Sequence, residues 1–270
     1  MYPNKRALQE LERLEIKSLN QNPTNWEKEN DKKQLKISSL NCRSLKKHID
    51  DIKSDKDLLK SDIICLQETW LENNTMSDDF QIENFELHLN SNGRGKGIAI
   101  YFKSRYFNHA LDIKKQNLQL SKFCSPNIDV VTLYRSQVEN VVHVSEELQN
   151  VITGEKPMIV IGDFNFCYLD PSLNSVKTFM RTKKFTQLIE TPTHLEGNLL
   201  DHAYIRGPYE CSAQVRGRYY TDHKSLHLIL KERGEFNDIS NKLLIIILIL
   251  GKGDEDIAKM DNRRNKLQKC

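Results

Sequence analysis

The sequence predicts an α/β domain in which buried sheets are covered by helices. Apolar runs of strand length, rich in β-branched residues, recur between Leu35 and Lys231. Stretches with the residue spacing of amphipathic helices lie between several of these runs. No repeat or low-complexity segment appears in the sequence, which is typical of one α/β domain.

The predicted strands and helices follow one another along this region. The expected strands are Leu35–Leu40, Ile63–Leu66, Ile98–Phe102, Val130–Tyr134, Met158–Ile161, Leu200–Ile205 and Leu226–Leu230. Helices are expected after Ser44, after Ser145 and after Pro171-Ser172. Their core-facing residues are Leu45, Ile49 and Ile52 in the first, Leu148 and Ile152 in the second, and Val176, Phe179 and Met180 in the third.

The domain is expected to span residues 35–231, with a leader before it and an irregular tail after it. Residues 1–34 are rich in Lys, Glu, Asn and Gln and carry spaced leucines, which predicts a short helix and a solvated linker. This leader either contacts a partner or the domain's own flank, or simply ends at the first strand. Residues 232–270 contain the apolar run Leu243–Leu250, which is either a buried strand or part of the tail; we expect the tail.

Bulk composition describes an ordinary globular protein and leaves its partners open. The 270 residues are 38% hydrophobic and 29% charged with a net charge of +3, so any phosphate affinity must come from a local patch. Six scattered cysteines contain no CxxC pair, which favours reduced thiols over a zinc site or a disulfide framework. The longest apolar run is far below the roughly 20 residues of a membrane span, and the start of the chain lacks a secretory signal, so an intracellular location without a membrane is expected.

Carboxylates and amides stand at the ends of the predicted strands. Glu68 ends the run that begins at Asp62, where it either caps the next segment or binds a cation. The run Met158–Ile161 leads into Gly162-Asp163-Phe164-Asn165. Because residues i and i+2 of an extended segment point the same way, Asp163 and Asn165 can face one substrate. Gly162 is expected to keep the approach to that substrate clear.

A histidine with two acids completes the pattern. His223 follows Asp222 just before the strand Leu226–Leu230, and Asp201 follows an apolar pair earlier in the chain. A carboxylate bonded to one imidazole nitrogen fixes the tautomer and raises the basicity of the other nitrogen. Hard oxygen ligands with one such histidine are typical of a magnesium-dependent phosphodiesterase.

Taken in order, these residues resemble a known superfamily. The set consists of Asn41, Gln67-Glu68, Tyr134, Gly162-Asp163-Phe164-Asn165, Asp201 and Thr221-Asp222-His223. It is similar to the exonuclease–endonuclease–phosphatase superfamily, which includes deoxyribonuclease I and abasic-site endonucleases. Each motif alone is weak, and the order and spacing of the motifs make the resemblance specific over about residues 35–231.

Longer stretches narrow the resemblance to mobile elements. They are Asn41-Cys42-Arg43-Ser44-Leu45, Leu66-Gln67-Glu68-Thr69-Trp70-Leu71, Tyr134-Arg135-Ser136, and Pro192-Thr193-His194 before Leu200-Asp201. These stretches resemble endonuclease domains of non-LTR retrotransposons and the nuclease module of some Helitron-type transposon helicases.

The resemblance implies a two-layer β-sandwich flanked by helices, the four-layer architecture of deoxyribonuclease I, with the site at one end of the sheets. It implies Mg²⁺, with Mn²⁺ as an alternative. The implied metal ligands are Glu68, with Asn41 beside it and Asp222 helping. The implied catalytic residues are Asp163 for the proton, Asn165 to orient the attacking water, Tyr134 and His223 on the phosphate, and Asp201 to orient His223. Thr193 is an implied substrate contact, because it matches a threonine near the site, with Thr191 as the alternative.

Two arginines are candidate substrate contacts. Many superfamily members carry an acid or amide where this chain has Arg43, and a guanidinium cannot ligate a metal. Arg43 either holds a flanking phosphate bidentately or forms a salt bridge with an acid of the cluster. Arg135 places a fixed cation beside the hydroxyl of Tyr134.

The expected function is DNA nicking by an endonuclease of a transposable element, acting in the nucleus beside a reverse transcriptase or helicase of the same element. The basic turn Asn92–Gly97 favours a nucleic-acid partner, because it can lie against a phosphate backbone. One alternative is a phosphoesterase of the same fold that acts on lipid or inositol phosphates. Another is a decayed transposon fragment that at most binds DNA.

Overall fold

The computed structural model describes residues 34–172 and 174–232. The predicted leader up to residue 33 and the tail from residue 233, including the apolar run Leu243–Leu250, lie outside the described residues. The first described strand begins at Gln34 and the last ends at Glu232, and the domain boundaries at residues 35 and 231 stay a prediction. In the described part of the chain, no helix combines the length and the apolar character needed to cross a bilayer.

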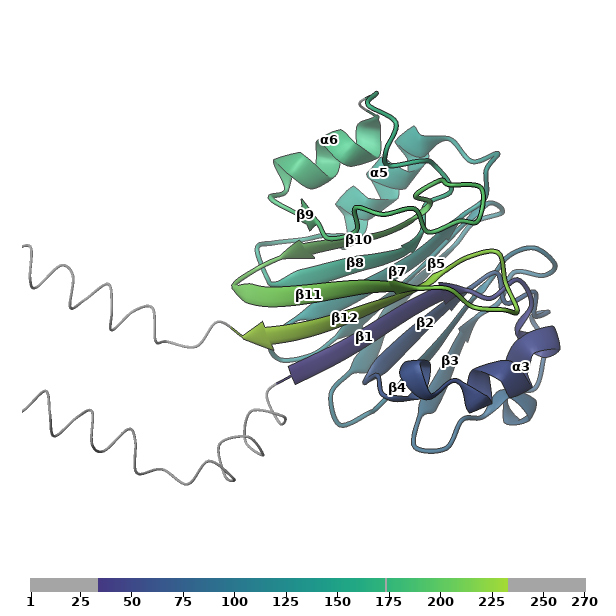
Figure 1. Cartoon of the computed structure of the whole chain (residues 1–270). Coiled ribbons are helices and arrows are strands. Elements are labelled where there is room, and N and C mark those ends of the chain that lie inside the picture. The colour runs from purple at the N-terminus through teal and green to yellow at the C-terminus, as the bar shows by residue number, and fades with distance from the viewer. Residues whose placement is uncertain (1–33, 173, 233–270) are drawn as a thin grey trace, which may run out of the picture. The chain divides into compact units, whose positions relative to one another are not determined.

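Two sheets of six strands form the centre of the fold (Figure 1). The first sheet contains, in spatial order, β11 (Tyr209–Arg216), β12 (Ser225–Glu232), β1 (Gln34–Asn41), β2 (Ile63–Gln67), β4 (Ile98–Phe102) and β3 (Glu86–Asn90). The second contains β5 (Asn108–Lys114), β6 (Leu118–Cys124), β7 (Asp129–Arg135), β8 (Met158–Asp163), β10 (Asp201–Arg206) and β9 (Thr186–Gln187). Every strand predicted from an apolar run overlaps one of these twelve.

One parallel pair of strands in each sheet explains where the polar strand ends meet. Strands β1 and β2 run parallel, with Asn41 opposite Gln67 at their carboxyl ends. Strands β7 and β8 also run parallel, with Tyr134 opposite Asp163. Parallel neighbours need a crossover connection, and here the crossovers are helical segments. The residues that follow these four strands therefore gather at one end of each sheet.

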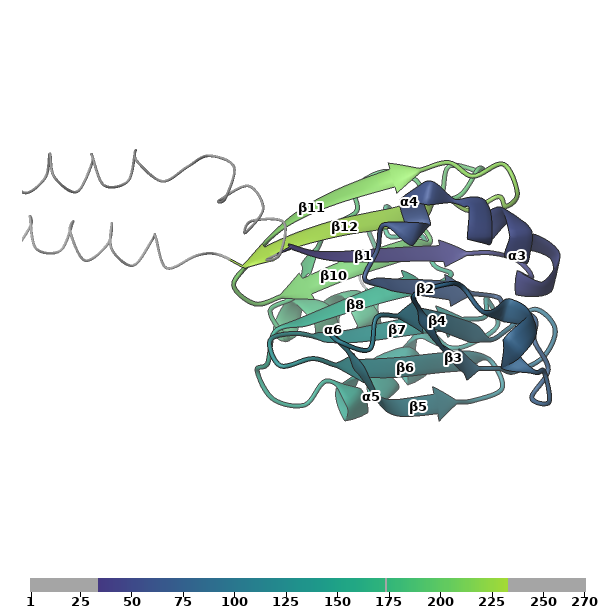
Figure 2. The ribbon, with the colours of Figure 1, turned by 90° about the horizontal axis from the view of Figure 1, so that it is seen from below.

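Helices cover the outer face of each sheet (Figure 2). The helices α3 (Leu45–Ser54) and α4 (Lys56–Leu59) pack on the first sheet, and α5 (Val141–Val151) and α6 (Ser175–Thr182) pack on the second. A short 3₁₀ helix, η1, covers Ser77–Phe80. The large apolar core between the sheets contains mainly Ile, Val, Leu and Phe side chains. The predicted four-layer sandwich is therefore confirmed.

The first predicted helix begins where its cap indicated, but the second and third do not. The third was expected to follow Ser172, whereas α6 begins at Ser175 after the N-cap Asn174, whose side chain accepts from the Lys177 N–H. The hydroxyl of Ser44 accepts from the backbone of Lys47 and begins α3. The prediction that a helix follows Ser145 is wrong, because α5 begins at Val141 after the N-cap Asn140, whose side chain accepts from the Val142 N–H at 2.9 Å. Ser145 lies inside the helix and donates to the carbonyl of Val142 instead.

Candidate active site

The amide of Asn41 joins the carboxylates of the two sheets. Its Nδ2 donates to Oε1 of Glu68 at 2.9 Å and to Oδ2 of Asp163 at 2.8 Å. Asn41 and Glu68 lie at the ends of β1 and β2 of the first sheet, whereas Asp163 ends β8 of the second. Asn41 is fully buried, and its own Oδ1 accepts from the backbone N–H of Arg43. Two acids far apart in the sequence thus share one donor.

Glu68 is held in place by its backbone and by a tryptophan. Its φ of 50° lies in the left-handed region, where a non-glycine residue is strained by about 1–2 kcal/mol. The carbonyl of Glu68 accepts from the N–H of Ser44, and its Oε2 accepts from Nε1 of Trp70 at 3.2 Å. Trp70 belongs to the stretch Leu66–Leu71 on which the resemblance rests, although sequence reasoning gave it no role.

Asp163 lies where its carboxyl group can hold a proton near neutral pH. It is fully buried between its strand neighbours Tyr134 and Asp201. Burial and the negative charge of Asp201 raise its pKa to about 7, and the positive charge of His223 acts in the opposite direction. The backbone N–H of Asn165 donates to Oδ1 of Asp163 at 2.9 Å, which fixes the orientation of the carboxyl group.

His223 and Asp201 form a buried pair beside Asp163. Nδ1 of His223 lies 2.8 Å from Oδ2 of Asp201. Burial opposes a charge on this ring, but Asp201, Asp163 and Asp222 together outweigh burial and raise the pKa of His223 to about 9, with Asp201 contributing most. The hydroxyl of Thr193 accepts from the N–H of Asp201 and fixes the start of β10. The imidazole is therefore charged at neutral pH and held through one nitrogen.

Asp222 is shared by a guanidinium and a second histidine. Nη1 of Arg43 donates to Oδ2 of Asp222, so the ion-pair alternative for Arg43 is the one present in this structure. Nε2 of His194 lies 3.3 Å from the same oxygen, and its ring centroid lies 4.9 Å from that of His223. His194 belongs to the motif Pro192-Thr193-His194, but a lone histidine in a loop gives no sign of its partner in the sequence.

Two predicted substrate contacts are corrected by burial. Arg135 is only 6% exposed, and its guanidinium donates to the backbone carbonyls of Phe164, Asn165, Gln137 and Glu139. It therefore holds the loop after β8 and cannot contact a phosphate as well. Thr193 is fully buried and supports Asp201 rather than a substrate.

The prediction for Gly162 is also corrected. A side chain there would clash with the protein itself and not with a substrate. Its Cβ atom would lie 2.0 Å from the carbonyl oxygen of Leu133 on the neighbouring strand β7.

The remaining predicted site residues, Asn165 and Tyr134, also lie at the site. Asn165 donates to the carbonyl of Arg135, and the hydroxyl of Tyr134 donates to the carbonyl of Gly95 at 3.0 Å.

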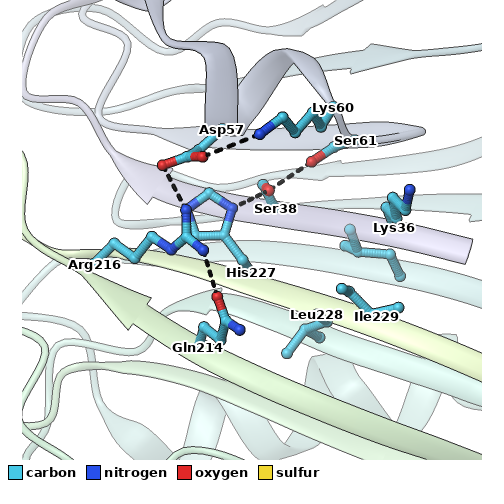
Figure 3. A pocket seen from close by; sticks show the side chains of 11 residues that line it. Lys36, Ser38, Asp57, Lys60, Ser61, Gln214, Arg216, His227, Leu228 and Ile229 are labelled. Atoms are coloured by element: carbon cyan, nitrogen blue, oxygen red, sulfur yellow. Dashed lines mark hydrogen bonds and ion pairs between the residues drawn. The ribbon is translucent and has the colours of Figure 1, made fainter.

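A separate pocket of about 160 Å³ lies over β1, β11, β12 and α4 and is lined by different side chains (Figure 3). The hydroxyl of Ser38 contacts Ser61 at 2.6 Å and Nδ1 of His227 at 2.8 Å. Arg216 at the rim pairs with Asp57. Burial and the two neighbouring arginines lower the pKa of His227 to about 4, so this imidazole is neutral at pH 7.

The sequence from residue 38 to residue 223 matches the family model described as Endonuclease/Exonuclease/phosphatase family. The chain belongs to this family. The match spans all the strand ends described above, from the middle of β1 to His223. No curated protein sequence matches the chain.

Solved structures share the fold of the family at low sequence identity. The endonuclease domain of TRAS1, a telomere-specific non-LTR retrotransposon, is 12% identical, with a TM-score of 0.57 over 74% of this chain and 100% of that chain. An AP endonuclease from Archaeoglobus fulgidus is 18% identical, with a TM-score of 0.55 over 72% and 98%. A variant of the 3′ phosphatase NExo from Neisseria, bound to a product DNA hairpin, is 14% identical, with a TM-score of 0.55 over 72% and 98%.

The residues at the strand ends fit the divalent cation that enzymes of this family use. Oδ1 of Asp201 and Oδ1 of Asp222 are buried and have no hydrogen-bond partner among the described residues. Ligand atoms of Asp163, Asp201 and His223 lie within 4.8 Å of one another, as do those of His194, Asp222 and His223. Such a concentration of buried acid oxygens is repulsive unless protons or a cation neutralise it.

Proposed function

We propose that this protein is a metal-dependent endonuclease that nicks DNA and is encoded by a transposable element. The observation that carries the proposal is the junction made by Asn41. It brings Glu68, a candidate metal ligand, and Asp163, a candidate proton acceptor, within hydrogen-bond distance of one amide. Hydrolysis of a phosphodiester needs both groups at one phosphorus atom.

Asp163 is proposed to take the proton of the attacking water. A general base works best when its pKa is near the working pH, and the pKa of Asp163 is raised to about 7. The side chain of Asn165 lies 3.5 Å from Oδ2 of Asp163 and is proposed to orient the water beside it. Tyr134 faces the same acid across the β7–β8 pair, where its hydroxyl can contact the phosphate.

His223 is proposed to stabilise the charge that develops on the phosphate. Its Nδ1 is held by Asp201, so Nε2 is the nitrogen that can donate to a non-bridging oxygen. Because its pKa is raised to about 9, the ring carries that proton at neutral pH. Loss of one such donor typically lowers the rate by about 10²–10³.

Glu68 is proposed as the principal ligand of Mg²⁺ or Mn²⁺, with Asn41 and Asp222 as further ligands. When bound, the cation neutralises charge on the non-bridging and leaving oxygens. Asp222 keeps one oxygen for this purpose, because Arg43 and His194 both contact its Oδ2. Arg43 has 49% of its side chain exposed, so it can also move to a flanking phosphate.

The basic turn beside the site favours a nucleic acid over a lipid or inositol head group. Trp70 donates its backbone N–H to the carbonyl of Lys96 at 2.9 Å, and Tyr134 reaches the carbonyl of Gly95. Arg94 lies over the ring of Trp70, 5.9 Å from its centroid. The turn therefore borders Glu68 and offers cations where the backbone of a long substrate would pass.

Comparing substrates side by side tests this function. The full chain with Mg²⁺ is given supercoiled plasmid, RNA, an inositol phosphate and a sphingomyelin vesicle, and phosphodiester cleavage is followed over time. The plasmid is expected to be nicked fastest. Faster cleavage of a head group would favour the second phosphoesterase function, and DNA binding without any cleavage would favour a decayed fragment.

A variant of the basic turn separates these outcomes further. Arg94→Ala with Lys96→Ala is expected to slow plasmid nicking and to reduce its salt dependence, since two phosphate contacts are lost. The pair Lys183→Ala with Lys184→Ala, one half-buried and one exposed lysine after α6, is the matched control, since Arg94 is exposed and Lys96 half-buried. An equal loss in both double variants would contradict a specific role for the turn. Action in the nucleus beside a reverse transcriptase or helicase belongs to the same proposal.

A further inference from the structure

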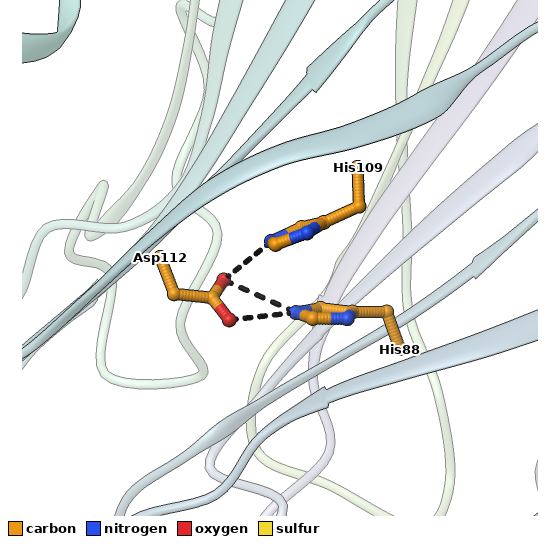
Figure 4. A group of neighbouring side chains, drawn as sticks. All are labelled: His88, His109 and Asp112. Carbon is orange, nitrogen blue, oxygen red and sulfur yellow. Dashed lines mark hydrogen bonds and ion pairs between the residues drawn. The ribbon is translucent and has the colours of Figure 1, made fainter.

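A second group of potential metal ligands lies between the sheet edges. His88 belongs to β3, an edge strand of the first sheet, and His109 and Asp112 belong to β5, an edge strand of the second (Figure 4). The two edges lie side by side, because Nδ2 of Asn90 on β3 donates to the carbonyl of Ile113 on β5 at 3.2 Å. These three residues, the edge triad, are absent from the proposed catalytic machinery.

Both imidazoles of the edge triad point the same nitrogen at one carboxylate. Nε2 of His88 lies 2.8 Å and 3.1 Å from the two oxygens of Asp112. Nε2 of His109 lies 3.2 Å from Oδ1. All three ligand atoms lie within 4.8 Å of one another. Donors bound to one tetrahedral Zn²⁺ at about 2.0–2.1 Å are separated by about 3.3–3.4 Å, so small side-chain shifts suffice.

A β-bulge brings two of these ligands to the same side of β5. In a regular strand, residues three apart point to opposite faces. Here His109 pairs with Phe123 and Leu111 pairs with Lys122, so the register shifts between them and Ala110 is the extra residue. Asp112 consequently faces the same way as His109. Bulges at sheet edges often redirect a side chain in this manner.

Neighbouring side chains hold the three ligands in place. The two rings stack with centroids 4.0 Å apart, and each ring packs against Phe123. The hydroxyl of Ser121 donates to Oδ1 of Asp112 at 2.7 Å and fixes the carboxylate. The side chains are 23%, 35% and 29% exposed for His88, His109 and Asp112, so solvent can reach the site.

The geometry points to a divalent transition-metal site, suited to Zn²⁺, that clamps β3 to β5 across the edges of the two sheets. Two imidazoles and a carboxylate suit Zn²⁺ or a similar borderline ion better than Mg²⁺, which prefers oxygen ligands. Three protein ligands leave a fourth position for water or another ligand. The site is independent of the proposed nuclease activity, since it uses neither its residues nor its strand ends.

Zinc binding by the full chain tests the site. Zn²⁺ affinity is measured by competition with a chromophoric chelator, and Co²⁺ is used as a visible-absorption probe of the ligand set. His88→Gln and His109→Gln are expected to weaken Zn²⁺ binding by at least about 10–100-fold and to remove the Co²⁺ band. A loss of this size is typical when only a hydrogen-bond partner of a metal ligand is mutated. His143→Gln is the matched control, because His143 also pairs with a carboxylate, Glu139 at 2.7 Å, but belongs to no group of three ligands among the described residues.

Melting temperature gives a second readout that does not depend on catalysis. Zn²⁺ is expected to raise the melting temperature of the wild type and of His143→Gln, since it binds only the folded state, and not that of the two edge-triad variants. Zinc bound at the candidate active site would raise the melting temperature of the wild type and of all three variants equally, so its effect cancels in the comparison. Equal affinity and equal melting shifts in all four would overturn the proposal, whether or not the protein nicks DNA.

Discussion

At the scale of single residues, the candidate site gives an acid, Asp163, and a histidine, His223, different pKa values. Burial and a neighbouring carboxylate raise the pKa of Asp163 to about 7. For His223, burial is outweighed by the charge and hydrogen bond of Asp201 together with the charges of Asp163 and Asp222, and its pKa rises to about 9. Near neutral pH, one group can accept a proton while the other holds one. Such separation of neighbouring titratable groups is how acid and base roles are assigned in active sites.

Replacing Asp201 by Asn tests the source of this separation. Without its carboxylate partner, burial dominates, and the pKa of His223 is expected to fall from about 9 to below its ordinary value of 6.5. An NMR titration of the imidazole resonances measures the change. The imidazole resonances of the exposed His143, which has no contact with Asp201, serve as the internal reference. If His223 still titrates near 9 in the variant, Asp201 does not hold its proton.

The same pair gives a pH dependence of stability with a definite sign. The folded pKa of His223 lies above 6.5, so the folded state binds more protons than the unfolded state between pH 6.5 and about 9. The stabilisation by the pair is complete below pH 6.5 and is lost as the pH rises through 9. Urea unfolding at pH 6 and pH 9 should therefore show a larger loss for the wild type than for His223→Gln. An equal loss would contradict the raised pKa.

The sequence predicts which residues lie at the site. It does not predict which partners their side chains contact. Asp163, Asp201 and His223 stand at fixed positions in ordered motifs, and the structure brings them together. The role of Arg135 depends on which way one side chain turns, and four backbone carbonyls outside its own motif decide this. His194 likewise contacts a partner, Asp222, that no local pattern reveals.

At the scale of elements, the parallel pair β7–β8 positions the catalytic acid. Gly162 pairs with Leu133 just before Asp163, and its φ of 146° is one that other residues rarely adopt. The backbones of the two strands approach so closely at this point that no Cβ atom fits. The position of Asp163 therefore depends on a glycine that touches no substrate.

Gly162→Ala is expected to destabilise the protein by at least about 2 kcal/mol, because backbone strain and a clash with Leu133 add together. Gly154→Ala is the matched control. Gly154 also has a positive φ, 70°, but nothing lies within 4 Å of its Cβ position, so only about 1–2 kcal/mol of conformational strain is expected. Urea unfolding measures both. Similar losses in the two variants would show that the contact with Leu133 is not decisive.

Strands buried at every residue could be predicted, whereas the edge strands and the partly exposed interior strand β6 could not. Strands β2, β4 and β8 are buried at every residue and read as continuous apolar runs. Strands β5 and β11 alternate exposed and partly buried residues and were not predicted. Their sequences carry charged residues along the exposed face, which blunts an edge but hides the strand in a search for apolar runs.

At the scale of the whole molecule, hydrogen bonds at the strand ends tie the two sheets together. Asn41 bridges acids of both sheets, and Nε2 of the buried Gln67 donates to the hydroxyl of Thr132 on β7 at 3.2 Å. The order of strands in each sheet, and hence the meeting of β3 with β5, depends on contacts between distant segments. Sequence periodicity does not encode those contacts; for the main domain the resemblance to a known family supplied them.

Low pH is expected to destabilise the fold through His227, which lines the pocket over β1, β11, β12 and α4. His227 has a folded pKa of about 4, below its ordinary 6.5, so the unfolded state binds more protons between these values (Figure 3). Its contribution is present above pH 6.5 and is lost as the pH falls through 4. Between pH 7 and pH 5, His227→Gln should lose roughly 1 kcal/mol less stability than the wild type, with allowance for its partial exposure. An identical loss in both proteins contradicts this.

Relaxation of supercoiled plasmid, with and without a chelator, is the most direct test of one active site built from four strand ends. The wild type is expected to nick plasmid with Mg²⁺ and to stop when the cation is removed. Glu68→Gln, Asp163→Asn and His223→Gln should each lower the rate by about 10²–10³ while circular dichroism stays unchanged, and the exposed control Asp170→Asn should not. Nicking that survives the chelator, or that is undiminished in all three variants, would contradict the account.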